Sequence, residues 1–213
     1  LDSAIAAVGP GVLECEVNAA AHDAMHRAGS EYLGHSAQFV ASPQSGLGFE
    51  CAERRPIPQD GAFYMEAGGT HNRYNCMLSR TVLVGDPDPK FEAMAKASRD
   101  GLNAAMAATK AGVTSHEVDK AARDAIAEAG FADAFAHRTG YSIGIGFPPD
   151  WGEGRIMSIN ENDPLVLEPN MCFHYIPDLK YGGFGGVVFS DSLVVTETGY
   201  EPLSEYSQEI FRK

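Results

Sequence analysis

Two stretches of this chain repeat each other at a fixed spacing. Residues 11–29 (GVLECEVNAAAHDAMHRAG) align without gaps on residues 112–130 (GVTSHEVDKAARDAIAEAG), with 10 identities in 19 positions at an offset of 101. A repeat of this kind indicates that one supersecondary unit occurs twice. We therefore expect two halves of similar architecture.

Each copy has the pattern of an amphipathic helix. In the second copy Thr114 and Glu117 form a capping-box signature, apolar residues follow at helical spacing, and Gly130 ends the pattern. A further helical pattern precedes it within residues 91–112, so each half should open with two helices. By the same offset about ten residues of the first opening helix are missing, so we expect the chain to begin inside a helix.

Strand-like segments follow the helices in both halves. SGLGF (45–49) and YSIGIGF (141–147) are expected to be equivalent strand ends. GAFYMEAGG (61–69) with SRTVLVG (79–85) predicts a hairpin, and 170–177 with 185–199 predicts its counterpart. The layout predicts an α+β fold with an internal pseudo-twofold, a curved antiparallel sheet with outer helices, and a site in the concavity between the halves.

Composition and charge narrow the classes of partner. Hydrophobic residues make up 44% and charged residues 21% of the chain, which is typical of a folded globular protein. The net charge of −13 argues against nucleic-acid or anionic-membrane partners. No apolar run has the length of a spanning helix, and four scattered cysteines without a CxxC pair favour reduced thiols in the cytoplasm.

The densest group of polar residues follows the first predicted hairpin strand. Glu66 lies at the end of an apolar strand, and His71 follows across a Gly-Gly pair. A carboxylate beside a histidine can supply a base or nucleophile together with a proton carrier. The alternative interpretation is a surface hairpin with ordinary polar residues.

A second group surrounds the only tryptophan. His137 and Tyr141 lie four residues apart and precede Asp150, Trp151 and Glu153. These residues are candidates for a ligand site, and the alternative is a β-rich stretch that ends in a Pro-Pro turn.

His174 lies in an otherwise apolar run and by itself has the pattern of a core histidine. The repeat places its strand near the counterpart of the Glu66 strand. It is therefore also a candidate to face the same cavity.

The duplicated layout, with AGVTSHEVDKAARDAIAEAG, resembles the pita-bread fold shared by creatinase, prolidase and methionine aminopeptidase. Within that superfamily, EAGGTHNRYNCMLSRTVLVG, HRTGYSIGIGFPPDWGE and EPNMCFHYIP resemble the ectoine hydrolases, a creatinase-like branch. The resemblance implies one pita-bread domain over 1–213, with halves of about 1–89 and 90–213. It also implies an N-terminal truncation that removes a preceding creatinase-type domain, and a homodimer.

The metallopeptidases of this superfamily hold two metal ions with two Asp, one His and two Glu. By the resemblance these positions fall on Glu66, Met77, Tyr141, Ile176 and Ser190. Thioether, phenol, alkyl and hydroxyl groups do not replace carboxylate and imidazole ligands. We therefore expect no metal site and no cofactor.

The resemblance to creatinase and ectoine hydrolase implies metal-independent hydrolysis of a C–N bond in a cyclic amidine such as ectoine. The implied substrate is a small zwitterion or amidine. The expected catalytic residues are Glu66, His71, His137, Tyr141 and His174, and we expect them to converge on one cavity. The expected substrate-binding residues are Arg80, Asp150, Trp151 and Glu153.

Two other functions stay open at this point. One is a metallopeptidase of the Xaa-Pro aminopeptidase or prolidase kind, which the fold favours and the missing ligands oppose. The other is a non-catalytic pita-bread module that binds a ligand or a partner chain.

Overall fold

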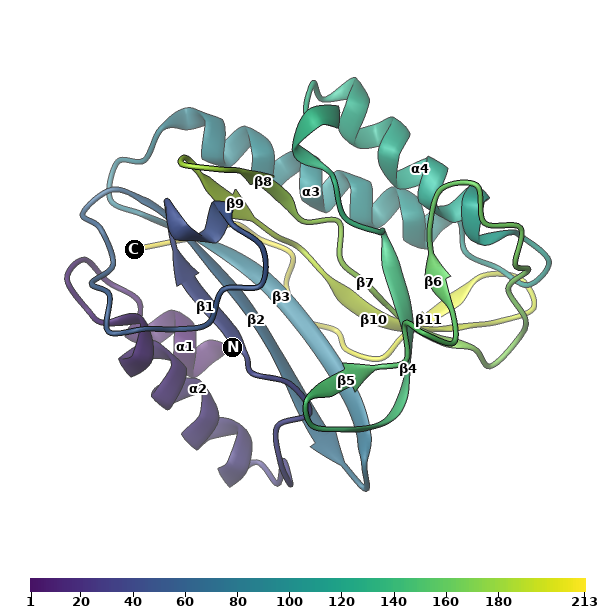
Figure 1. The fold of residues 1–213 in the computed structure, drawn as a ribbon, viewed down its shortest axis with the longest axis horizontal. Helices are drawn as coiled ribbons and strands as arrows, with labels where there is room; N and C mark the ends of the chain where they lie inside the picture. The colour runs from purple at the N-terminus through teal and green to yellow at the C-terminus, as the bar shows by residue number, and fades with distance from the viewer.

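Four α-helices form two pairs in this computed structural model, which describes residues 1–213. In Figure 1, α1 and α2 lie side by side next to the strands of the first half, and α3 and α4 lie next to those of the second. The helices are α1 (Asp2–Ala7), α2 (Glu14–Arg27), α3 (Pro89–Ala108) and α4 (Ser115–Glu128). The helices expected at the two repeats are therefore confirmed.

The repeats also make matching contacts. Gly11 and Gly112 precede the two helices with φ of 79° and 88°, in the left-handed region that favours glycine. Their N–H groups donate to the carbonyls of Ile57 at 2.9 Å and Leu167 at 2.9 Å. Both helices are therefore fixed at their N-termini by an equivalent backbone contact.

A ten-stranded, mostly antiparallel sheet joins the halves. Its main path runs β1-β2-β3-β4-β7-β10-β11, and β5 and β6 pair with β4 while β12 pairs with β3. A separate two-stranded sheet consists of β8 and β9. The bounds are β1 (Gln38–Ala41), β2 (Gly61–His71), β3 (Tyr74–Val84), β4 (Gly140–Phe147), β5 (Asp150–Gly152), β6 (Ser158–Ile159), β7 (Cys172–Tyr175), β8 (Leu179–Tyr181), β9 (Gly185–Val187), β10 (Asp191–Val195), β11 (Tyr200–Pro202) and β12 (Phe211–Arg212). The expected α+β fold and the hairpin of the first half are confirmed.

The two halves meet where β3 passes β10. Ser79 and Ser190 form a backbone bridge at this crossing. The hydroxyl of Thr81 bonds the N–H and C=O of Val188, at 2.8 and 2.9 Å. In the opposite direction, the hydroxyl of Ser192 bonds the N–H and C=O of Met77, at 3.2 and 2.9 Å. These reciprocal contacts are those of a pseudo-twofold axis at the crossing, here called the seam (residues 77–81 and 188–192).

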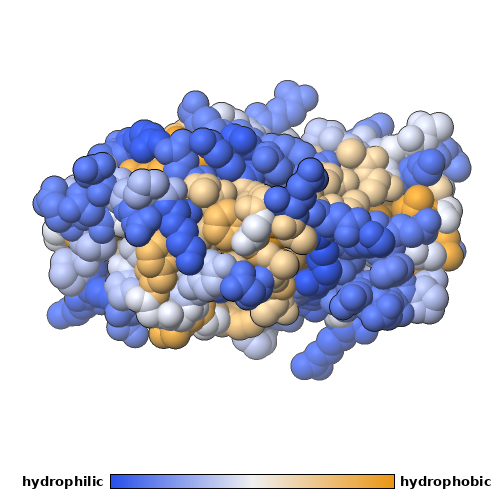
Figure 2. Space-filling model, turned by 90° about the horizontal axis from the view of Figure 1, so that it is seen from above, coloured by the Kyte–Doolittle hydropathy of each residue, from blue (hydrophilic) through white to orange (hydrophobic).

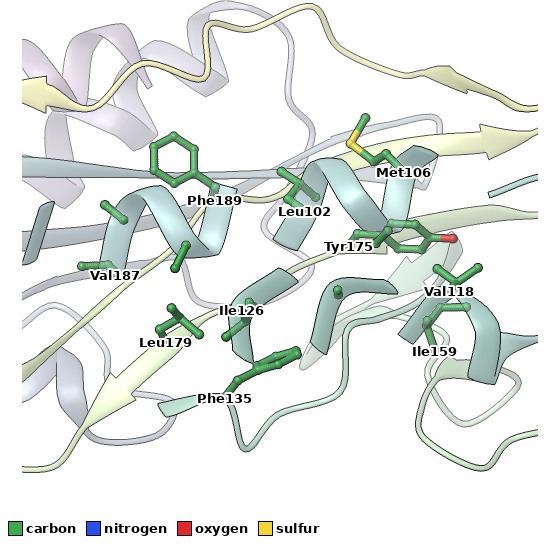
Figure 3. Close-up of a cluster of buried hydrophobic side chains, with 14 of the residues drawn as sticks. Leu102, Met106, Val118, Ile126, Phe135, Ile159, Tyr175, Leu179, Val187 and Phe189 are labelled. Carbon is green, nitrogen blue, oxygen red and sulfur yellow. The ribbon is translucent and has the colours of Figure 1, made fainter. Parts of the chain in front are cut away.

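Three groups of buried apolar residues fill the interior. The largest has 24 members, and Figure 3 shows part of it around α3 and α4, including Leu102, Met106, Ile126, Tyr175 and Phe189. A group of 13 lies between α1, α2 and the strands of the first half. The third is small and takes members from both halves, so it packs the region between them: Tyr64, Met77, Tyr141, Ile143, Trp151, Ile176 and Val188.

One expected strand is absent. Residues 45–49 form no strand; instead the short 3₁₀ helix η1 (Gln44–Gly46) packs on the β8–β9 hairpin. The Ser45 hydroxyl accepts from the N–H of Gly186 at 2.9 Å and donates to its carbonyl at 3.3 Å. A Cβ at Gly46 would lie 2.2 Å from the carbonyl oxygen of Tyr181. The glycines here serve close packing of two backbones rather than strand pairing.

The outer surface carries most of the charge. Hydrophilic side chains cover much of the face in Figure 2, with apolar side chains gathered near its middle. None of the helices combines the length and apolar content that a membrane crossing requires.

The cap of α4 gives a first test. The Thr114 hydroxyl accepts from the N–H of Glu117 at 3.2 Å, and the Glu117 carboxylate accepts from the N–H of Thr114 at 2.7 Å. Thr114→Val keeps the shape and removes this acceptor, so the free energy of unfolding should fall by about 1 kcal/mol. Urea denaturation measures it, with Thr114→Ser as the control that keeps the hydroxyl. Equal stability of Thr114→Val and wild type would show that this cap contributes nothing.

Candidate active site

A cavity of about 980 Å³ opens between the halves, here called the central cavity. Its walls come from the segment before β1, from β2, β4, β5 and β8, and from the loops at residues 46–49 and 133–138. The charged and aromatic side chains that line it are His35, Phe49, Tyr64, Glu66, Asp133, His137, Arg138, Tyr141, Phe147, Asp150, Trp151, Arg155, Asp178 and Lys180. Both halves therefore contribute to one polar and aromatic cavity.

Two buried carboxylates line this cavity, Glu66 and Asp178, and Glu66 is the less exposed of them. It lies on β2 between Gln38 of β1 and Ser79 of β3, and 2% of its surface is exposed. Gln38 Nε2 donates to Glu66 Oε2 at 2.9 Å, whereas Oε1 makes no hydrogen bond within the chain. The pKa of Glu66 is raised to about 8, chiefly by burial and also by the negative charge of Asp178, while the positive charge of Lys180 opposes the rise. The free oxygen is left for a water or a substrate.

Tyr141 stands at the centre of a chain of hydrogen bonds. Trp151 Nε1 can only donate, so it donates to the Tyr141 hydroxyl at 2.9 Å. Burial raises the pKa of Tyr141 well above its usual value, so the phenol keeps its proton and donates it to His174 Nδ1 at 2.9 Å. One lone pair of the Tyr141 oxygen remains available to a ligand.

His174 supports this tyrosine from behind. Burial lowers the pKa of His174 to about 3, so the ring is neutral at ordinary pH. Because Nδ1 accepts from Tyr141, the proton lies on Nε2, which donates to Ser190 Oγ at 2.6 Å. His174 is fully buried and does not line the central cavity. The structure therefore gives it a positioning place rather than the direct contact that the sequence suggested.

His137 reaches the cavity from the loop before β4. Its Nδ1 donates to the carbonyl of Arg138 at 3.0 Å, which leaves Nε2 as an acceptor in the neutral ring. Burial lowers the pKa of His137, and the charge of Asp178 opposes that shift. The ring is therefore favoured in its neutral form, with an unprotonated Nε2 that can accept a proton.

Trp151 has the most constrained position of the aromatic residues. A Cβ at Gly34 would lie 2.8 Å from Trp151 Cβ, and one at Gly68 would lie 2.7 Å from its ring. The ring also lies 4.9 Å from that of His35. Any side chain at either glycine displaces the indole, so the two glycines fix its position beside Asp150.

Three of the expected site residues lie elsewhere. His71 ends β2, five residues beyond Glu66, and about 3.3 Å per strand residue carries it to the exposed tip of the hairpin. It lines a second hollow on the other face of the sheet, together with Glu153. The convergence expected for all five catalytic candidates is therefore wrong for His71, and also for His174, which lies behind Tyr141 and does not line the cavity. Glu153 does not share the cavity with Asp150 and Trp151.

Arg80 is the third. It is fully buried at the seam, where Nη2 pairs with Asp191 Oδ1 at 2.9 Å. Its other donors bond the carbonyls of Ser79, Ser190, Tyr206 and Ser207. With these donors bonded inside the protein, Arg80 does not reach the central cavity, and its expected substrate-binding place is wrong.

The residues at the implied metal positions do not fit a dinuclear centre. Met77, Tyr141 and Ile176 pack against one another in the third apolar group, and Ser190 Oγ accepts from His174. The structure holds no group of three or more His, Cys, Asp or Glu side chains that could bind a metal. Glu66 is the one carboxylate of the set, and a single carboxylate does not hold two hard cations.

Several residues that line the central cavity were not predicted from the sequence. Gln38 fixes Glu66, Asp178 and Lys180 set the charge around it, and Arg138 lies over the Tyr141 ring at 4.6 Å. Asp178 and Lys180 carry no local motif. Arg138 lies directly between His137 and Tyr141, so its proximity to that pair was the available signal.

Glu66 makes the stability dependent on pH. Its folded pKa of about 8 lies above the ordinary 4.5, so the folded state keeps a proton that the unfolded state releases. The contribution of this group to stability therefore falls as the pH rises from 4.5 to about 8, by up to about 1.4 kcal/mol per pH unit. Glu66→Gln should be more stable than wild type at pH 8 and nearly equal to it near pH 4. Urea melts of both proteins across this range decide it; parallel curves would contradict the buried neutral carboxyl.

A variant of Arg80 distinguishes a structural role of this residue from a role in substrate binding. Arg80→Met leaves Asp191 buried without its partner, so the free energy of unfolding should fall by about 3–5 kcal/mol. The double variant Arg80→Met/Asp191→Leu removes both charges and should recover much of this loss. A stable single variant that had lost only ligand affinity would return Arg80 to the substrate site.

Comparisons with known proteins identify relatives of this chain. The chain is 36% identical over 158 residues to the ectoine hydrolase of Halomonas elongata, which covers 74% of this chain and 39% of that protein. It is 35% identical over 148 residues to a Xaa-Pro dipeptidase of Lactobacillus delbrueckii, with 68% and 38% coverage. The prolidase structure of Pyrococcus horikoshii superposes with a TM-score of 0.91 at 25% identity, over 99% of this chain and 59% of that one.

The prolidase likeness confirms the expected pita-bread architecture. The chain spans well under two thirds of the length of these relatives. The model of metallopeptidase family M24 matches residues 1–197. The chain is therefore a member of the metallopeptidase family M24, with a hydrolase fold.

Proposed function

We propose that this chain is the catalytic domain of a metal-independent hydrolase that opens a cyclic amidine such as ectoine. The observation that carries the proposal is that buried Glu66 is the one carboxylate among the five implied metal positions, the other four being Met77, Tyr141, Ile176 and Ser190. A cyclic amidinium is already electrophilic at the carbon between its nitrogens, so its opening needs a base and a proton donor rather than a Lewis acid.

The cavity suits a small zwitterion. Arg138, Arg155 and Lys180 provide positive charge, and Glu66 and Asp178 are among the acidic groups. The Trp151 face offers a surface for a delocalised cation. The remaining lone pair of the Tyr141 oxygen can accept an N–H of the amidinium, since its proton is already donated to His174.

Substrate binding would activate the base. An amidinium beside Glu66 favours the ionised carboxylate, so its pKa falls from about 8 when the cation enters. The carboxylate then accepts a proton from a water, and the hydroxide oxygen bonds the amidinium carbon. A tetrahedral intermediate forms in which that carbon holds one oxygen and both ring nitrogens.

Ring opening follows by proton return. The proton held by Glu66 passes to one ring nitrogen, and the bond from the carbon to that nitrogen breaks. The intermediate's hydroxyl proton is released as the C=O bond forms, and we assign its acceptance to His137 Nε2, which is free because Nδ1 donates to the carbonyl of Arg138. The products are an amide and a free amine, which together contain one added water.

The longer protein is part of the proposal as well. The preceding creatinase-type domain and the homodimer implied by the resemblance to creatinase stay proposals, and so does the cytoplasmic location.

Product analysis tests the proposal. Ectoine is incubated with the purified chain, and the ring-opened amide is followed by proton NMR. We expect turnover that persists after exhaustive chelation and falls about a hundredfold or more in Glu66→Gln. Glu128→Gln, on the exposed end of α4, is the matched control and should keep wild-type rates.

Two results would overturn it. Cleavage of Xaa-Pro dipeptides that appears with added Mn²⁺ and disappears with chelator would identify a metallopeptidase. Saturable ectoine binding without any turnover, in wild type and variants alike, would identify a non-catalytic binding module.

A further inference from the structure

Lys180 is one of three lysine and arginine residues that line the central cavity, and no step of the proposed reaction uses it. It lies in the middle of β8, opposite Gly186 of β9. A Cβ at Gly186 would lie 2.9 Å from Lys180 Cγ, so the stem of the lysine lies flat on the glycine. The stem is therefore held, and only the ammonium end projects along the cavity wall.

The ammonium group is incompletely bonded. Nζ pairs with Asp178 Oδ2 at 2.5 Å, and it makes no other hydrogen bond within the chain. An ammonium has three donors, so two of them have no protein acceptor. The side chain is 21% exposed, which is enough for contact with a ligand in the cavity.

Two aromatic rings flank the same ammonium. Nζ lies 5.1 Å from the centre of the Tyr64 ring and 6.0 Å from that of Phe49. Tyr64 is buried beside Glu66, whereas Phe49 is exposed on the loop at the cavity mouth. The rings reduce the access of water to the cation, and this strengthens its attraction for an anion.

We propose that Lys180 binds the carboxylate of the substrate and so selects cyclic amidines that carry an acid group. The inference rests on the proposed function and names the group that fixes the orientation of the ring. Two oxygens of a carboxylate match the two unused donors of the ammonium. With the acid group held there, the amidinium is directed toward Glu66, whose ionisation Lys180 and Asp178 already influence.

The competing assignment is a structural ion pair in which Lys180 only neutralises Asp178. Two ligands separate the possibilities: ectoine, and the same methyl-tetrahydropyrimidine ring without its carboxylate. For wild type we expect ectoine to bind about tenfold or more tightly than the bare ring. Isothermal titration calorimetry on the purified chain measures both affinities.

Lys180→Met should weaken the binding of ectoine and should not weaken the binding of the bare ring. Ectoine binding should weaken about tenfold or more, because its carboxylate loses the ammonium. The bare cationic ring should bind as well as before or more tightly, because Asp178 is no longer neutralised. The double variant Lys180→Met/Asp178→Asn removes one charge of each sign and leaves the net charge of the cavity unchanged, so it tests the same loss of preference without leaving Asp178 buried and unpaired.

Lys120 provides the matched control. Its Nζ pairs with Asp124 at the same 2.5 Å, on the exposed face of α4. Lys120→Met should leave both affinities unchanged.

Several outcomes would overturn the inference. One is an unchanged preference for ectoine in both Lys180 variants, and another is wild type that binds neither ligand. A loss of preference in Arg155→Met but not in Lys180→Met would place the carboxylate at the other cation. Lys180-dependent ectoine binding without hydrolysis would support the inference and contradict the proposed function. Hydrolysis of ectoine with a ligand preference that does not depend on Lys180 would support the proposed function and contradict the inference.

Discussion

The seam between β3 and β10 is the contact on which the rest of the molecule depends. No helix crosses between the halves there, and the join consists of one backbone bridge, two reciprocal hydroxyl contacts and the Arg80–Asp191 pair. The hydroxyls of Thr81 and Ser192 satisfy backbone groups that would otherwise be buried without partners. The bonding here is thus short-range and directional, which fixes the position of one half against the other within narrow limits.

Ser190 connects the seam to the central cavity. The same residue bridges Ser79 by its backbone and accepts from His174 by its side chain, and His174 in turn accepts from Tyr141. The tyrosine that faces the ligand is therefore held by the residue at the pseudo-twofold axis. In this chain a polar relay and an apolar group occupy the place where the resemblance puts bound cations, and they hold the two halves together there instead.

Local patterns in the sequence were enough for the helices and the first hairpin. The repeat located α2 and α4, and the apolar segments bounded by glycines located β2, with Glu66, and most of β3. Glu66, Tyr141 and Trp151 could be placed together because the resemblance covers both strand regions. Arg80 could not be placed, because its acidic partner lies 111 positions away and no local signal reports burial. Lys180 escaped for a similar reason: the pairing of β8 with β9 brings it to the cavity, and that pairing leaves no periodic pattern in three residues.

The ion pair at the seam also bears on how a duplicated fold diverges. Residues 77–81 read MLSRT and residues 188–192 read VFSDS, so Arg80 and Asp191 occupy equivalent places on the two sides of the axis. In a dimer of two identical halves, the residue at such a place faces its own copy across the axis. Arginine would then meet arginine, or aspartate meet aspartate, as buried like charges. Only a chain in which the halves are covalently joined and free to differ can put opposite charges there, so this contact belongs to the fused protein and to no symmetric ancestor of it.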